Sequence, residues 1–100
     1  MSDQPIALIT GGAQGIGYAC AEAIAENGAR IVLADINGDG VKAAAKTLGG
    51  KTVAIECDMG NAAQVAAMFD RIESEVGTVS ILVNGAGIAI PNDFLETPLE

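Results

Sequence analysis

The sequence lacks histidine altogether and has only 2 cysteines among its 100 residues. Without histidine, a Ser/His/Asp triad, a histidine-ligated zinc site and histidine acid–base chemistry are excluded from this stretch. Cys20 and Cys57 are far apart and form no C-x-x-C pair. This spacing argues against a metal knuckle or a disulfide scaffold and favours reduced thiols in a core.

Basic residues are also scarce, with 5 Lys and Arg against 13 Asp and Glu and a net charge of -8. Such a charge repels a phosphate backbone, so we expect no nucleic-acid partner. No apolar run reaches the ~18 residues of a membrane span, and the N-terminus has no basic region followed by an apolar stretch. We therefore expect a cytoplasmic protein without a membrane partner.

What the sequence does contain is a hydrophobic core: 50% of its residues are hydrophobic, 18% are charged, and the mean hydropathy is +0.39. This composition indicates a folded domain, and 100 residues are enough for a single domain. Short apolar runs alternate with segments of helical period, as in β-α-β units. The runs are typical of parallel strands covered on both faces, and they lie at residues 6–10, 30–35, 52–57 and 79–84.

Three helices are predicted between these strands. The first spans residues 14–27 and stops at Gly28. The second spans 41–48 and is closed by two glycines, and the third carries an apolar stripe from Val65 to Val76. Asn61 is the expected cap of the third helix, with Gln64 completing a capping box.

Residues 97–100, Thr-Pro-Leu-Glu, have the pattern of a helix start. One helical turn is not stable alone, because nucleation costs more than one turn returns. We therefore expect residues 1–100 to be the front portion of a longer protein, truncated after the fourth strand.

A glycine-rich turn connects the first strand to the first helix, with Gly11, Gly15 and Gly17 in a G-x-x-x-G-x-G pattern. Backbone N–H groups at a helix N-terminus can hold a phosphate when no Cβ intervenes. A Walker A loop is excluded, because Tyr18 stands where that motif needs lysine. A purely structural corner between strand and helix remains an alternative.

Polar residues end the next three strands. Asp35 can accept hydrogen bonds from ribose hydroxyls, or it can cap the next helix. Asp58 can accept from an adenine amino group, or it can shape a turn. Asn84 can bridge neighbouring strands beside a ligand, although residues 84–87 alone are compatible with a plain turn. A phosphoacceptor role for Asp58 is disfavoured, because no acidic pair follows the first strand to hold magnesium.

In their order along the chain, these motifs resemble the short-chain dehydrogenase/reductase family over essentially the whole sequence. The family's TGxxxGxG loop is similar to residues 10–17, its acid after the second strand to Asp35, and its adenine-side aspartate to Asp58. Its NNAG motif is similar to residues 84–87, with Gly85 in place of the second asparagine. The family's catalytic Ser and Tyr-x-x-x-Lys would lie beyond residue 100, and Tyr18 is followed four residues later by Glu22.

The resemblance implies an α/β, Rossmann-type parallel sheet in the order 3-2-1-4, forming the NAD-binding portion of a single-domain enzyme. It implies an NAD-dependent oxidoreductase, with NAD favoured over NADP, that interconverts a small-molecule secondary alcohol or polyol and a ketone as a homo-oligomer. The 100-residue piece alone would be inactive, with no catalytic residue. A non-catalytic NAD-binding module or sensor is the alternative. The implied cofactor-binding residues are Gly11, Gln14, Gly15, Ile16, Gly17, Asp35, Ile36, Asp58, Met59, Asn84, Ala86 and Gly87.

Overall fold

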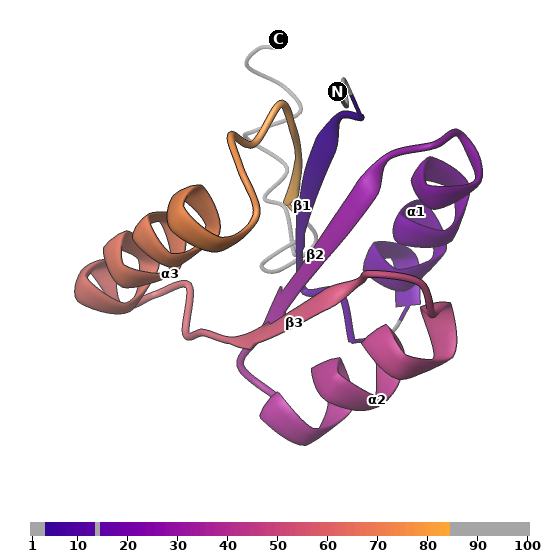
Figure 1. Ribbon diagram of the computed structural model, residues 1–100. Helices are drawn as coiled ribbons and strands as arrows, with labels where there is room; N and C mark the ends of the chain where they lie inside the picture. Colours follow the sequence, from indigo (N-terminus) through magenta and orange to yellow (C-terminus); the bar gives the residue numbers. More distant parts are fainter. Residues whose placement is uncertain (1–3, 14, 85–100) are drawn as a thin grey trace, which may run out of the picture.

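A four-stranded parallel sheet with helices on both faces forms the body of the protein (Figure 1). The computed structural model describes residues 4–13 and 15–84. Over these residues strands and helices alternate strictly, and the sheet order β3-β2-β1-β4 confirms the predicted order. The elements are β1 (Ile6–Thr10), α1 (Gly15–Glu26), β2 (Arg30–Asp35), α2 (Gly38–Leu48), β3 (Val53–Glu56), α3 (Ala62–Glu75) and β4 (Ile81–Asn84).

The sheet separates two apolar clusters, because successive side chains of a strand point to opposite faces. On one face Ile9 and Leu33 pack with alanines and Val41 from α1 and α2. On the other face Leu8 and Val32 pack with side chains of α3. Figure 1 shows α1 and α2 together on one side of the sheet and α3 on the other. The central strands are therefore buried on both faces, as their continuous apolar runs predict.

The outer strands are shorter than predicted, because each pairs with a single neighbour in the described part of the chain. β3 pairs with β2 from Val53 to Glu56, and β4 pairs with β1 from Ile81 to Asn84. The predicted strand 52–57 loses one residue at each end, although the Cys57 N–H still donates to the Asp35 carbonyl at 2.9 Å. The predicted strand 79–84 loses its first two residues.

The predicted start of the second helix at Val41 is wrong, because α2 begins at Gly38. Asn37 caps it: its side chain accepts a hydrogen bond from the Gly40 N–H at 3.0 Å. The two glycines in this first turn favour a loop by propensity, but the cap satisfies a helix-end donor and extends the helix. At the other end Gly49, with φ 79°, terminates the helix as predicted.

The cap of α3 is confirmed, since the Asn61 side chain accepts from the Gln64 N–H at 3.0 Å. The predicted capping box is not formed. The Gln64 side-chain oxygen instead accepts from the Asp58 N–H at 2.9 Å, and the Asn61 N–H donates to the Asp58 carbonyl. Gln64 therefore ties the start of α3 to the turn that follows β3.

Some predictions fall on residues that lie outside the described ones, namely the helix start at 97–100 and the candidate ligands Gln14, Ala86 and Gly87. Among the helices of residues 4–13 and 15–84, none is long and apolar enough to cross a membrane.

Candidate functional site

The described residues of the predicted site lie at one edge of the sheet, because parallel strands all end on the same side. Thr10 ends β1, Asp35 ends β2 and Asn84 ends β4. The register places Thr10 opposite both Ala34 and Asn84. This edge, which we call the carboxyl edge, is where ligands bind in open α/β sheets.

The glycine turn folds back against the end of β2. The N–H groups of Gly11 and Gly12 both donate to the Ala34 carbonyl, at 2.7 and 3.2 Å. Gly11 and Gly15 have φ values of 69° and 67°, which side-chain-bearing residues rarely adopt. A methyl group on Gly17 would overlap the carbonyl oxygen of Gly11. The turn thus brings the start of α1 against backbone with no intervening side chain, which fits a phosphate cradle.

The Asp35 carboxylate fastens two segments to the end of β2. One oxygen accepts from the Ala13 N–H of the glycine turn at 3.0 Å, and the other accepts from the Asn37 N–H at 3.0 Å. The alternative that Asp35 caps the next helix is wrong, because Asn37 is that cap. A carboxylate offers about four acceptor positions, so two remain for other donors.

Two large hydrophobic side chains lie open at this edge. Ile16, near the start of α1, is 72% exposed, and Ile36, directly after β2, is 65% exposed. Single exposed hydrophobic residues are common, but these two flank the glycine turn and the Asp35 carboxylate. Apolar contacts beside a few fixed polar groups are typical of small-molecule sites.

Asp58 and Met59 follow β3 at the same edge. Asp58 shapes the turn, since one carboxylate oxygen accepts from the Gly60 N–H at 2.9 Å. Met59 packs against the α3-side cluster. The turn-forming alternative for Asp58 is therefore present, and its contact with adenine stays a prediction.

Cys57 is buried in the α3-side cluster, as expected of a core thiol. Burial raises the pKa of the Cys57 thiol, and the neighbouring Asp58 carboxylate raises it further. The thiol is held protonated rather than poised for nucleophilic chemistry.

The Asn84 side chain bridges neighbouring strands, as predicted. Its side-chain oxygen accepts from the Thr10 hydroxyl at 2.8 Å in a partly buried setting. The sequence argument did not single out Thr10 or the Ala13 N–H. The signal for Thr10 was a hydroxyl residue at the end of an otherwise apolar strand, whereas a backbone donor such as Ala13 leaves no trace in sequence.

No cluster of three or more His, Cys, Asp or Glu side chains within residues 4–13 and 15–84 could hold a metal ion. The carboxyl edge instead combines a parallel sheet, a side-chain-free turn into a helix and an acid at the end of the second strand. These features define a Rossmann-type nucleotide-binding fold.

The chain belongs to the short chain dehydrogenase family, whose model matches residues 5–100. It is 47% identical to D-threitol dehydrogenase of Mycolicibacterium smegmatis over 90 residues, which cover 87% of this chain and 35% of that protein.

Two solved structures are similar to this chain. The 2-keto-3-deoxy-D-gluconate dehydrogenase of Streptococcus agalactiae has a TM-score of 0.76 and 42% identity, covering 84% of this chain and 33% of that one. The 3-ketoacyl-(acyl-carrier-protein) reductase of Brucella melitensis, complexed with NADH, has a TM-score of 0.75 and 33% identity, covering 81% and 34%. This chain thus spans about a third of the length of these relatives.

Proposed function

We propose that residues 1–100 are the NAD-binding portion of a longer, single-domain, cytoplasmic oxidoreductase that works as a homo-oligomer. Its reaction interconverts a small secondary alcohol or polyol and a ketone. The observation that carries the proposal is the Asp35 carboxylate, held by the Ala13 and Asn37 N–H groups beside the glycine turn. The polyol dehydrogenase among the relatives supports the substrate class.

In this proposal the backbone at Gly11, Gly15 and Gly17 holds the pyrophosphate of NAD. The open space beside Gly15, where no atom lies within 4 Å of the position of a Cβ, and the positive end of α1 suit an anion without a basic side chain. Ile16, at the start of α1, offers exposed apolar surface next to the same segment.

The two free acceptor positions of Asp35 suit the ribose hydroxyls, and Ile36 lies beside the same sugar. Asp58 and Met59 would border the adenine. The remaining proposed contacts are Gln14 at the glycine turn and Asn84, Ala86 and Gly87 at the nicotinamide ribose.

The same carboxylate favours NAD over NADP. A 2′-phosphate would add roughly two negative charges beside Asp35, and juxtaposed like charges cost several kcal/mol. The segment from Ile36 to Gly40 contains no basic residue and a further acid, Asp39. Nothing in that segment offsets the repulsion.

NAD, when bound, supplies the hydride chemistry, and the residues of this chain bind and orient it. Tyr18 packs against the apolar cluster on the α1 and α2 side, which agrees with a structural role. We therefore assign no catalytic residue to this chain and propose that the 100-residue piece alone is inactive.

The test measures kcat/KM of the complete protein for NAD and NADP, with a panel of polyols and secondary alcohols. We expect turnover with NAD at least about 30-fold more efficient than with NADP, equivalent to roughly 2 kcal/mol. Preference for NADP would overturn the role of Asp35. Tight NAD binding without turnover of any alcohol or ketone would favour a non-catalytic NAD-binding module.

A further inference from the structure

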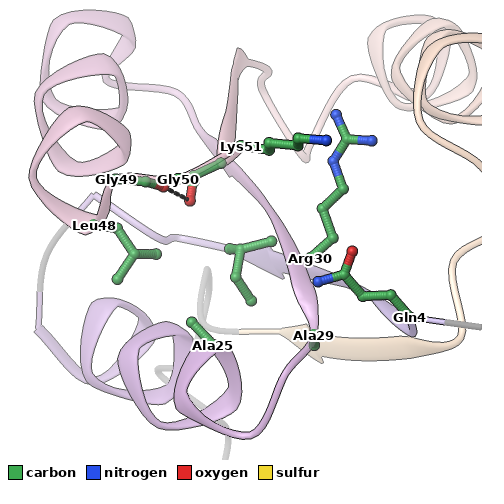
Figure 2. A pocket seen from close by; sticks show the side chains of 10 residues that line it. Gln4, Ala25, Ala29, Arg30, Leu48, Gly49, Gly50 and Lys51 are labelled. Carbon is green, nitrogen blue, oxygen red and sulfur yellow. Dashed lines mark hydrogen bonds between the residues drawn. The ribbon is translucent and has the colours of Figure 1, made fainter. Parts of the chain in front are cut away.

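A cavity lies at the opposite end of the strands from the glycine turn, where β2 begins. Its volume is about 440 Å³, and it is bounded by the N-terminal segment, the end of α1, the start of β2 and the loop between α2 and β3. Figure 2 shows Arg30 and Gln4 on one side of it, and Leu48 and Ala25 on another. We call this cavity the amino-edge pocket.

Two positive charges line the amino-edge pocket in a chain that is strongly acidic. Arg30 and Lys51 are 2 of only 5 basic residues, and both border the cavity. In Figure 2 their side chains extend from β2 and from the α2–β3 loop. Among the described residues the one salt bridge joins Arg71 and Glu75, so no carboxylate in that part of the chain neutralises either pocket cation.

The Arg30 side chain also carries an unsatisfied donor. Its Nε atom is buried and has no hydrogen-bond partner within the described part of the chain. Burying an N–H group without an acceptor is unfavourable, so such a donor points to an acceptor supplied from outside. The Nε–H and a neighbouring Nη–H of a guanidinium form a fork that matches two oxygens of a carboxylate or phosphate.

The rest of the lining limits the ligand further. Leu48, Ala25 and Ala29 contribute apolar surface to the same cavity. The Gln4 side-chain amide is fixed nearby, since its nitrogen donates to the Gly28 carbonyl at 2.9 Å. A bare inorganic ion would leave this apolar surface uncovered.

We propose that the amino-edge pocket binds a small organic anion, with a carboxylate or phosphate on Arg30 and Lys51 and a short apolar portion against Leu48. The site is separate from the cofactor site, because Arg30 and Asp35 stand at opposite ends of β2. The amino-edge pocket uses none of the residues that we assign to NAD binding.

The test titrates the complete protein with butyrate, butyl phosphate, inorganic phosphate and n-butanol, and follows amide and arginine Nε–H signals by NMR. We expect saturable shifts at Arg30 Nε–H and at residues 49–52 with butyrate or butyl phosphate, and none with n-butanol. The tighter of the two organic anions identifies the headgroup. Shifts confined to residues 11–17, or tighter binding of inorganic phosphate than of both organic anions, would overturn the proposal.

Variants locate the site independently. Arg30→Gln should weaken binding at least about tenfold, because it removes both the charge and the fork, and Lys51→Gln should weaken it about threefold. Lys51 is exposed in a loop, so its variant is expected to fold normally. Lys46→Gln is the matched control, since Lys46 lies on α2 outside the pocket lining. Unchanged affinity in both pocket variants, or equal loss in the control, would contradict the assignment.

Discussion

The two ends of β2 carry opposite charges, which differ in their hydrogen bonding. At the carboxyl edge, both oxygens of Asp35 accept backbone N–H groups, from Ala13 and Asn37. At the amino edge, the buried Nε of Arg30 meets no acceptor within the described residues. The Asp35 carboxylate thus helps to hold its own site together, whereas the Arg30 Nε–H is available to a ligand under our proposal.

The difference follows from what each edge offers. Chain leaving the carboxyl ends of β1 and β2 turns into helices, and the first residues of these connections present backbone N–H donors. Those donors suit an acid and an anionic ligand but not a base. A parallel sheet therefore produces two chemically distinct edges, and each should respond differently to substitution.

Gly17→Ala should have the largest effect, because the added methyl overlaps the Gly11 carbonyl and displaces the glycine turn. We expect NAD affinity of the complete protein to fall at least about 100-fold, since the phosphate-binding backbone moves. Titration calorimetry measures the affinity, and urea unfolding the accompanying loss of stability.

Gly28→Ala is the control near the amino edge. It strains a residue with φ 95° but has no atoms within 4 Å of the added Cβ. It should lower the unfolding free energy by about 1 kcal/mol and leave NAD affinity unchanged. An equal loss of NAD affinity in Gly17→Ala and Gly28→Ala would contradict the prediction that NAD binding depends on the carboxyl edge alone.

Asp35→Ala should lower kcat/KM for NAD. It should also reduce the difference in kcat/KM between NAD and NADP, by about 2 kcal/mol when expressed as a free energy. The reason is the loss of both the ribose acceptors and the repulsion of a 2′-phosphate. Asp35→Asn keeps one acceptor oxygen for the backbone while removing the charge, so it should narrow the gap with a smaller loss of stability.

The matched control for Asp35 is Asp39→Ala, which removes an acid from the first turn of α2. The ratio of its kcat/KM values for NAD and NADP should stay within about twofold of the wild-type ratio, because the effect of an exposed charge is weak. A wild-type ratio in Asp35→Ala would show that this carboxylate is not beside the ribose.

Thr10→Val tests the link between β1 and β4 at the carboxyl edge. The substitution keeps the shape and removes the hydroxyl of the buried Thr10, which donates to the Asn84 side-chain oxygen at 2.8 Å. The unfolding free energy should fall by about 1–2 kcal/mol. Thr78→Val, at an exposed hydroxyl 3.4 Å from Glu73, should change it by less than about 0.5 kcal/mol. Comparable losses in the two variants would contradict a special role for the Thr10–Asn84 bond.

The smallest expected effect is that of Cys57 on the stability of the fold, and it appears only at alkaline pH. Its pKa is raised in the folded protein by burial and by Asp58, so the folded state holds the thiol proton more tightly than the unfolded state. The resulting stabilisation is complete below the unfolded thiol pKa of about 8.5 and is lost as pH rises through the higher folded value.

Urea unfolding from pH 7 to 10 measures this dependence. Cys57→Ala should show a shallower loss of stability with rising pH than wild type. An identical dependence of stability on pH in the wild type and in Cys57→Ala would show that Cys57 contributes nothing to it.

Much of the fold was predictable because the relevant signals are local. The apolar run at residues 6–10 and the stop at Gly28 depend on a few neighbouring residues, and the structure reproduces both. The start of α2 was missed because local propensity at Gly38 and Gly40 opposed a helix, and the Asn37 cap overcame it. The capping box failed because Gln64 found a different partner in Asp58.

The sequence by itself determined the alternation of strands and helices, the glycine turn and the charge at each end of β2. Backbone periodicity and residue chemistry are sufficient for these features. Tertiary structure alone decided that the Asp35 carboxylate meets the Ala13 N–H, that Gly17 lies against Gly11, and that Arg30 and Lys51 border one cavity. Such pairs depend on strand register and helix packing, because both set where distant side chains and backbone groups come within reach.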